Sequence, residues 1–219
     1  MKFHYLLCWY FLRGLFAVFF RWRVVGVERI PMTGPVVLAS NHASFLDPPL
    51  IGAAVPREAS FLARESLFRF PLLGGLIRSI NALPVDRDGR SPRGLKTILG
   101  RLKQQAPVVL FPEGTRTTDG RLLPARSGVG LAVIKSGAPV VPIRIFGSFE
   151  AYSRKMWLPR PYRISVVFGD PIDFSQLRRE AESGQKERVK EIYSEVSDQI
   201  MAAISALEPD GSSSDDSKS

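Results

Sequence analysis

The chain contains a single cysteine, Cys8, and two histidines, His4 and His42, among its 219 residues. One cysteine excludes an intramolecular disulfide framework and any structural zinc site built from several cysteines. Nothing in the composition therefore requires an oxidising compartment, and a protein that faces the cytosol is the simpler expectation.

Acidic residues are also scarce: 21 Asp and Glu against 30 Lys and Arg leave a formal net charge of +9. Such a balance attracts nucleic acid, anionic lipid headgroups and phosphorylated substrates alike. The sequence lacks an aromatic-basic surface motif or recognition module, so nucleic acid is not the expected partner. With 45% hydrophobic residues, the length suits one well-packed domain and leaves no room for a second full one.

The N-terminus holds the longest apolar run, residues 3–20, which is interrupted only by His4, Arg13 and Gly14. A helix of this length reaches about 27 Å, slightly less than the roughly 30 Å hydrocarbon core of a bilayer. Arg13 near its centre adds about 2.5 to 3.5 kcal/mol to the expected cost of insertion, which favours an interfacial helix over a clean span. A cleaved signal peptide does not fit, because residues 21–23 (RWR) follow directly. A helix buried in the protein core is the alternative.

From about Val24 onward, short β-rich runs alternate with helical patterns. This alternation is typical of an α/β domain with a mostly parallel sheet flanked by helices. Strands are expected at 36–39, 59–63, 107–111, 139–146 and 162–168. One helix is expected to begin at Asp47, its N-cap, and another at Ser91. Two more are expected over 127–136 and over 175–207, the last with a break at Gly184. We therefore divide the chain into a membrane-associated segment (1–23), one α/β domain (24–207) and an acidic tail (208–219) that we expect to be disordered.

One candidate loop, residues 41–47 (NHASFLD), lies between a buried strand and a helix start. The imidazole of His42 is a natural group to take a proton from an alcohol near pH 7, and a carboxylate such as Asp47 can fix its tautomer. Five positions of separation let the two side chains turn toward each other in a tight loop. The alternative is that Asp47 only caps its helix and His42 is an ordinary loop residue.

A second candidate loop, residues 111–116 (FPEGTR), follows the strand at 107–111, where an open α/β sheet places its ligand crevice. Gly114 lets the backbone approach a ligand closely. Thr115 and Arg116 can donate hydrogen bonds to phosphate oxygens, the arginine as a bidentate fork. Taken alone, the segment is also compatible with a charged surface turn.

Together the two loops resemble motifs of the phosphate acyltransferase family, whose members acylate glycerol-3-phosphate and lysophosphatidic acid. Residues 41–47 match the family pattern NHxxxxD, and residues 111–116 match FPEGTR in the expected order. Residues 82–87 look like a further motif that ends in an arginine, here Arg87, and residues 140–143 look like a hydrophobic-proline motif. The resemblance covers roughly Val24 to Asp173. One departure is Arg64, where many members carry lysine.

The resemblance implies an O-acyltransferase that moves a fatty acyl group from an acyl thioester to the sn-2 hydroxyl of 1-acyl-sn-glycerol-3-phosphate, giving phosphatidic acid. His42 is then the general base and Asp47 orients it, while backbone amides near the start of the Asp47 helix are expected to stabilise the oxyanion. A thiolate leaves readily, so neither Ser44 nor Cys8 is expected to act as a nucleophile. The acceptor phosphate is expected to bind to Arg87, Glu113, Gly114, Thr115 and Arg116, with Glu113 orienting the arginines.

The short chain lacks the extra helical domain of larger glycerol-3-phosphate acyltransferases, which favours the lysophosphatidic acid reaction. Glycerol-3-phosphate or another lyso-lipid stays open as acceptor, and acyl-coenzyme A and acyl carrier protein both stay open as thioester carriers. No metal and no bound cofactor is expected. The expected location is the cytosolic face of a membrane, the inner membrane if the source is bacterial, because Arg21 and Arg23 flank the apolar run. A noncatalytic basic lipid-binding protein is the distant alternative, against which the intact motif pair argues.

Overall fold

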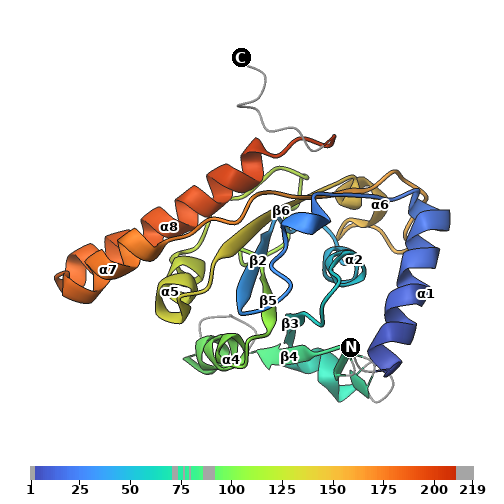
Figure 1. Ribbon diagram of the computed structural model, residues 1–219. Coiled ribbons are helices and arrows are strands. Elements are labelled where there is room, and N and C mark those ends of the chain that lie inside the picture. Colours follow the sequence, from blue (N-terminus) through green and yellow to red (C-terminus); the bar gives the residue numbers. More distant parts are fainter. Residues whose placement is uncertain (1–2, 71–73, 76, 79, 86–91, 211–219) are drawn as a thin grey trace.

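The computed structural model describes residues 3–70, 74, 75, 77, 78, 80–85 and 92–210. Its centre is a seven-stranded sheet with the order β1-β7-β6-β2-β5-β3-β4 (Figure 1). Neighbouring strands pair in parallel except for β6 and β7, which pair antiparallel. The strands are β1 (Arg23–Val25), β2 (Val36–Ser40), β3 (Ser60–Arg64), β4 (Ala82–Val85), β5 (Pro107–Leu110), β6 (Val140–Phe146) and β7 (Ser165–Phe168). The predicted α/β fold with a mostly parallel sheet is confirmed.

The central strand β2 is covered on both faces. Val36 and Leu38 join one apolar cluster, whereas Val37 and Ala39 join the other. Successive side chains of a strand point to opposite faces, so a strand covered on both faces must be apolar at every position. This requirement explains why the sequence here is a continuous apolar run without polar alternation.

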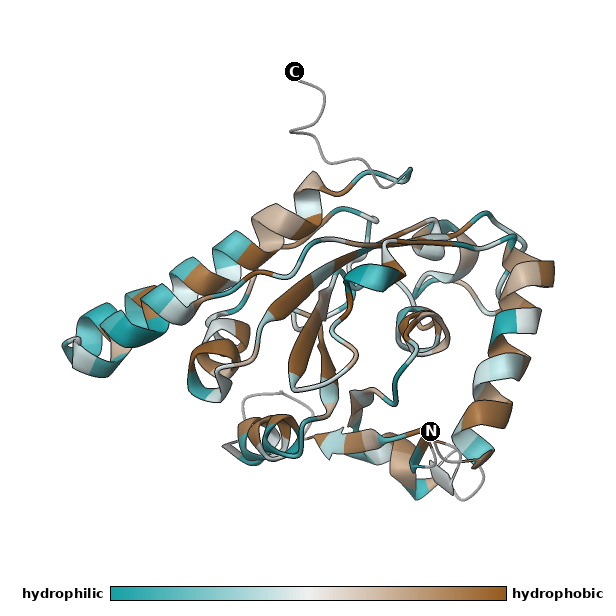
Figure 2. Ribbon diagram, in the orientation of Figure 1, coloured by the Kyte–Doolittle hydropathy of each residue, from teal (hydrophilic) through white to brown (hydrophobic). Residues whose placement is uncertain are grey.

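Helices form the two outer layers. One face of the sheet is covered by α1 (Phe3–Phe20), α2 (Asp47–Ala54) and the short α6 (Ser148–Tyr152). The other face is covered by α4 (Pro92–Lys103), α5 (Ser127–Ser136), α7 (Ser175–Ser183) and α8 (Lys186–Ala206). Short 3₁₀ turns, η1 (Val27–Arg29) and η2 (Glu65–Arg69), follow β1 and β3. Figure 2 shows hydrophobic residues concentrated in the central strands, whereas α7 and the start of α8 are mostly hydrophilic.

The apolar helix α1 presents one face to the protein. Tyr5, Phe16 and Phe20 are buried there. The Trp9 indole donates to the Val55 carbonyl at 3.0 Å, and the Arg13 guanidinium donates to the Ala53 carbonyl at 2.9 Å. These two carbonyls lie at the C-terminal end of α2, which favours positive charge. Arg13 therefore faces the protein and not the exposed apolar side of α1.

The opposite face of α1 is exposed and apolar, with Phe3, Leu7, Phe11 and Val18 pointing away from the domain. Within the described residues α1 is the one helix long and apolar enough to cross a membrane, with a mean hydropathy of 1.4. Core helices and signal sequences meet the same criteria of length and composition. Only 17% of α1 is buried, so it does not have the surroundings of a core helix.

Candidate active site

The two motif loops meet because their strands are neighbours. β2 and β5 pair in parallel, with Ala39 opposite Leu110. Parallel strands end at the same edge of the sheet, so the segments that follow them, 41–47 and 111–116, lie side by side at the carboxyl edge. This is the position at which open α/β sheets carry their ligand sites.

The His42 and Asp47 side chains are in contact, with 2.8 Å between His42 Nδ1 and Asp47 Oδ2. The same carboxylate oxygen accepts hydrogen bonds from the backbone amides of Ala43 and Ser44, each at 2.7 Å. The N-cap of α2 is Leu46, and Asp47 is its first residue with no side-chain capping bond. The expectation that Asp47 is the helix cap is wrong, because its carboxylate turns back to His42.

The imidazole ring of His42 is held by a second contact. It stacks on Phe111, with 4.0 Å between ring centroids and 18° between ring planes. The His42 side chain is 17% exposed, whereas that of Asp47 is fully buried. With Nδ1 donating to the carboxylate, Nε2 carries the lone pair that can accept a proton from a substrate at the surface.

Glu113 joins the two loops through the backbone. One carboxylate oxygen accepts from the His42 amide at 2.8 Å, and the other accepts from the Leu123 amide at 3.1 Å. The Thr117 amide in turn donates to the His42 carbonyl at 2.9 Å. Burial raises the Glu113 pKa to about 6, opposed by the two amide hydrogen bonds and assisted by the charge of Asp47. Both oxygens of Glu113 serve the backbone, so the structure does not support its expected role of orienting the arginines.

The turn at Gly114 requires a glycine. Its φ of +66° lies in the left-handed region, and a Cβ added there would come within 2.8 Å of Arg126 Cδ. Gly114 is exposed and Thr115 is half-buried next to it. The backbone of this turn is therefore accessible to a ligand beside the Arg116 guanidinium.

Arg116 lies over the ring of Phe45, with its guanidinium carbon 3.5 Å from the ring centroid. Its Nη1 is buried and has no hydrogen-bond partner within the described part of the chain. Burial lowers the Arg116 pKa, and the charges of Arg154 and Arg64 lower it further. Arg116, Arg154 and Arg64 thus create a positive potential at this place. A bound anionic ligand would reduce the repulsion among their charges. Arg87, also predicted to bind the phosphate, lies outside the described residues.

The amides expected to stabilise an oxyanion are mostly occupied. Those of Ala43 and Ser44 bond to Asp47, and that of Leu46 bonds to the Ser44 hydroxyl at 3.0 Å. The next two residues, Pro48 and Pro49, have no amide hydrogen. The start of α2 therefore offers fewer free donors than the sequence suggests.

Tyr152 and Arg154 were not found from the sequence, because both lie outside the motif segments. The Ser44 hydroxyl donates to the Tyr152 carbonyl at 2.7 Å, and the rings of Phe45 and Tyr152 are 5.5 Å apart. The Ser44 hydroxyl thus joins the loop 41–47 to the end of α6. Only a long-range contact shows this, and the local sequence carries no signal for it.

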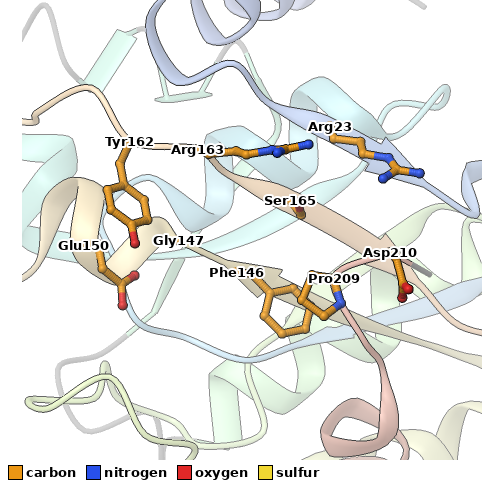
Figure 3. A pocket seen from close by; sticks show the side chains of 9 residues that line it. All are labelled: Arg23, Phe146, Gly147, Glu150, Tyr162, Arg163, Ser165, Pro209 and Asp210. Atoms are coloured by element: carbon orange, nitrogen blue, oxygen red, sulfur yellow. The ribbon is translucent and has the colours of Figure 1, made fainter. Parts of the chain in front are cut away.

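A separate shallow pocket of about 470 Å³ lies beside β1, β6 and β7. Its lining residues are Arg23, Phe146, Gly147, Glu150, Tyr162, Arg163, Ser165, Pro209 and Asp210. Figure 3 shows Arg23 and Arg163 next to each other, and the carboxylates of Glu150 and Asp210 at opposite ends. None of the predicted site residues that the structure describes lines this pocket.

The described residues contain no group of three or more His, Cys, Asp and Glu that could hold a metal ion. The chemistry that the site offers is instead that of a buried acid, a partly exposed base and a cluster of arginines. Such a set is suited to deprotonating a hydroxyl on a phosphorylated molecule.

Comparison with known proteins agrees with this chemistry. Residues 21–146 match the family model described as acyltransferase. The chain therefore belongs to the acyltransferase family.

Relatives within the family carry a more specific name. The chain is 33% identical over 150 residues to the chloroplastic 1-acyl-sn-glycerol-3-phosphate acyltransferase BAT2 of Brassica napus, a match covering 67% of this chain and 43% of the relative. It is 28% identical to the Bacillus subtilis 1-acyl-sn-glycerol-3-phosphate acyltransferase, covering 71% of this chain and 77% of the relative. The crystal structure of the 1-acyl-sn-glycerophosphate acyltransferase PlsC from Thermotoga maritima superposes with a TM-score of 0.72 and 26% identity, covering 93% of this chain and 80% of that one.

Proposed function

We propose that the protein transfers a fatty acyl group from an acyl thioester to the sn-2 hydroxyl of 1-acyl-sn-glycerol-3-phosphate, forming phosphatidic acid. The observation that carries this proposal is the 2.8 Å contact between His42 and the buried Asp47. Next to it lies Arg116, whose buried Nη1 has no hydrogen-bond partner among the described residues. A base and an anion site next to each other suit an acceptor that has a hydroxyl near a phosphate. The names of the relatives support the same reaction.

In the proposed reaction His42 Nε2 accepts the hydroxyl proton while the acceptor oxygen attacks the thioester carbonyl carbon. The carbonyl becomes a tetrahedral oxyanion, which collapses as the carbon–sulfur bond breaks. The thiolate departs and takes the proton from the imidazolium, so His42 returns to its neutral form. Asp47 stabilises the imidazolium between these two transfers, because its carboxylate remains hydrogen-bonded to Nδ1.

The acceptor phosphate would bind between Arg116 and Arg64, with the backbone at Gly114 and the Thr115 hydroxyl beside it. Arg64 is the last residue of β3, the strand next to β5, and its charge already acts on Arg116. An arginine at position 64 keeps the positive charge of the lysine in the family pattern. Its planar guanidinium can also donate two parallel hydrogen bonds to a phosphate. Arg87 follows β4 in the sequence and is proposed to act on the same phosphate.

We further propose that α1 holds the enzyme at the cytosolic face of a membrane. Its exposed face is apolar, and Arg21 and Arg23 follow it directly. The acceptor and its product are amphiphiles that stay in the bilayer, so an enzyme at the interface meets them without extracting them into water. Coenzyme A and acyl carrier protein are both proposed as thioester carriers, because nothing in the site distinguishes them.

The test is an acyl-transfer assay with the purified full chain. Acceptors are 1-acyl-sn-glycerol-3-phosphate, glycerol-3-phosphate and a lysophospholipid with a capped phosphate, each offered with acyl-coenzyme A and with acyl carrier protein thioesters. We expect the highest kcat/KM with 1-acyl-sn-glycerol-3-phosphate. A higher kcat/KM with glycerol-3-phosphate would show that this compound, and not its 1-acyl derivative, is the acceptor. No turnover with any combination of acceptor and thioester would favour a noncatalytic lipid-binding protein.

A further inference from the structure

The loop between α6 and β7 presents a nearly bare tryptophan to solvent. Trp157 is 88% exposed and its neighbour Leu158 is 63% exposed. The loop, residues 153–163, also carries four exposed cationic residues, Arg154, Lys155, Arg160 and Arg163. The sequence has no acidic residue between Glu150 and Asp170 to balance them. The loop lies outside residues 21–146, which match the family model.

Hydrogen bonds give this loop a defined shape. The Arg160 amide donates to the Ala151 carbonyl at 2.9 Å, and the Arg160 guanidinium donates to the Glu150 carbonyl at 2.7 Å. A further turn is closed by the Met156 amide, which donates to the Ser153 carbonyl at 3.2 Å. The base of the loop is thus fixed, and Trp157 is held outward at its tip.

One end of the loop is joined to the catalytic site. It begins directly after Tyr152, which accepts from Ser44 and packs on the half-exposed Phe45. The Tyr152 hydroxyl donates to the Trp157 carbonyl at 3.5 Å. Arg154 is close enough to Arg116 for its charge to act on it. The loop therefore borders the entrance to the proposed phosphate site.

The other end of the loop is joined to α1 (Figure 1). The Ile164 amide donates to the Phe20 carbonyl at 3.3 Å, and the Arg23 amide donates to the Ile164 carbonyl at 2.9 Å. The loop thus returns to the C-terminal end of the helix whose outer face is exposed and apolar. These backbone bonds fix the C-terminal end of the loop against the end of α1.

We propose that the loop 153–163 is a second lipid-contacting element, in which Trp157 and Leu158 enter the interface of an anionic bilayer beside the active-site entrance. This inference rests on the proposed function. Tryptophan suits the boundary between headgroups and acyl chains, because its ring is apolar while its N–H can bond to polar groups. Lys155 and Arg154 lie where they can pair with lipid phosphates. An acidic acyl carrier protein would also match the positive charge, but the exposed Trp157 and Leu158 at the tip and the backbone bonds that join the loop to the end of the apolar helix α1 favour lipid.

The first measurement is fluorescence quenching of the full chain bound to vesicles of phosphatidylglycerol and brominated phosphatidylcholine. The difference between wild type and Trp157→Phe isolates the emission of Trp157 from that of Trp9 and Trp22. We expect the Trp157 component to be quenched and shifted to the blue on binding. A component that stays unquenched and unshifted would overturn the proposal. Quenching does not depend on turnover, so an inactive protein with a quenched Trp157 would refute the proposed reaction and leave this inference standing.

The second measurement compares two forms of the acceptor. The double variant Trp157→Ala, Leu158→Ser should raise the apparent KM for acceptor embedded in vesicles about ten-fold, the scale expected when large apolar side chains no longer become buried. Turnover of a short-chain, water-soluble acceptor should not change. Met32→Ser is the matched control, because Met32 is 61% exposed and precedes β2 at the opposite edge of the sheet. Equal loss with both acceptors, or no loss with either, would overturn the proposal.

A third comparison addresses the competing protein partner. Lys155→Gln is assayed with acyl-coenzyme A and with acyl carrier protein thioesters at saturating vesicle acceptor. We expect the same KM for each thioester as in the wild type. A raised KM for the carrier-protein thioester alone, together with an unquenched Trp157, would make the loop a protein-docking surface and refute contact with lipid.

Discussion

Replacing Asp47 by asparagine tests whether the buried carboxylate acts through His42. Asp47 Oδ2 accepts three N–H groups, from His42, Ala43 and Ser44, at 2.7 to 2.8 Å. Asparagine can keep its oxygen at that position only if its NH₂ group occupies the position of Oδ1, which is buried and without a partner among the described residues. In the reverse orientation, the NH₂ group of the asparagine would face the three N–H groups of His42, Ala43 and Ser44, and no hydrogen bond could form.

Both orientations are costly. A hydrogen bond to a charged group contributes about 1.5 to 3 kcal/mol against about 0.5 to 1.5 for a neutral pair, and a buried unpaired donor costs about 1 to 3 kcal/mol. The imidazolium also loses its counter-charge during proton transfer. We therefore expect kcat to fall by about 10² to 10⁴, the scale of general-base catalysis, while the KM for the acceptor changes little.

The assay is steady-state release of thiol from acyl-coenzyme A at saturating acceptor, with circular dichroism and thermal unfolding to confirm that the variant folds. Asp119→Asn is the matched control, because Asp119 is exposed and bonds to the Thr117 hydroxyl at 2.9 Å in the adjoining loop. This control should retain near wild-type turnover. A folded Asp47→Asn protein with more than a tenth of the wild-type kcat would show that His42 does not depend on this carboxylate.

Three further predictions concern other parts of the site and the helix α1. Burial raises the Glu113 pKa from 4.5 to about 6, so folding favours the protonated carboxyl; this contribution to the free energy of unfolding is complete below pH 4.5 and is lost as pH rises through 6. Denaturant unfolding between pH 4 and 7.5 should show a larger loss of stability with rising pH in wild type than in Glu113→Gln, by on the order of 1 kcal/mol. Arg116→Ala should raise the KM for the phosphorylated acceptor about ten- to hundred-fold with an unchanged KM for the thioester, and an effect on the thioester alone would move Arg116 to the donor side. Leu7→Ser with Val18→Ser on the exposed face of α1 should release protein from membranes at high salt without lowering its melting temperature, whereas Phe16→Ser on the buried face should lower it.

Point substitutions on α1 test anchoring more cleanly than deletion of residues 1–20 would. Tyr5, Phe16 and Phe20 belong to the buried face of α1, and Arg13 bonds to α2. A deletion would therefore remove part of the core along with the surface proposed to face the membrane. Serine substitutions confined to the exposed face separate the two effects.

Much of the fold follows from local patterns in the sequence. The buried strands were recognisable because short apolar runs dominate them, as in β2 and β5, and the break in the C-terminal helix at Gly184 was marked by the glycine itself. β1 and β4 were not among the expected strands, because three or four residues carry too little pattern to identify a strand. The antiparallel pairing of β7 with β6 was not foreseen either, since strand direction depends on the path of the connecting loop.

The site was predictable where the chemistry is local. The spacing of His42 and Asp47 allowed their contact, and the shared edge of β2 and β5 brought the two loops together. The role of Glu113 as a bridge between backbones was not predictable, because its partner amide is 71 positions away. The orientation of Arg13 was missed for the same reason: its partner is on another helix, and an apolar sequence does not tell which face a lone arginine takes.

The hydrogen bonds from Trp9 and Arg13 to the C-terminal end of α2 hold α1 in a fixed orientation against the domain. Asp47 is at the N-terminal end of α2. This helix has eight residues, so Asp47 is only about 12 Å from the C-terminal end, to which α1 is hydrogen-bonded. The surface proposed to touch lipid and the proposed catalytic pair therefore move as one piece. In that arrangement the height of His42 above the bilayer is a fixed property of the protein. Lipids whose hydroxyl lies at a different depth beneath their phosphate would reach the base less often, so vertical position within the membrane becomes a criterion for selecting the acceptor.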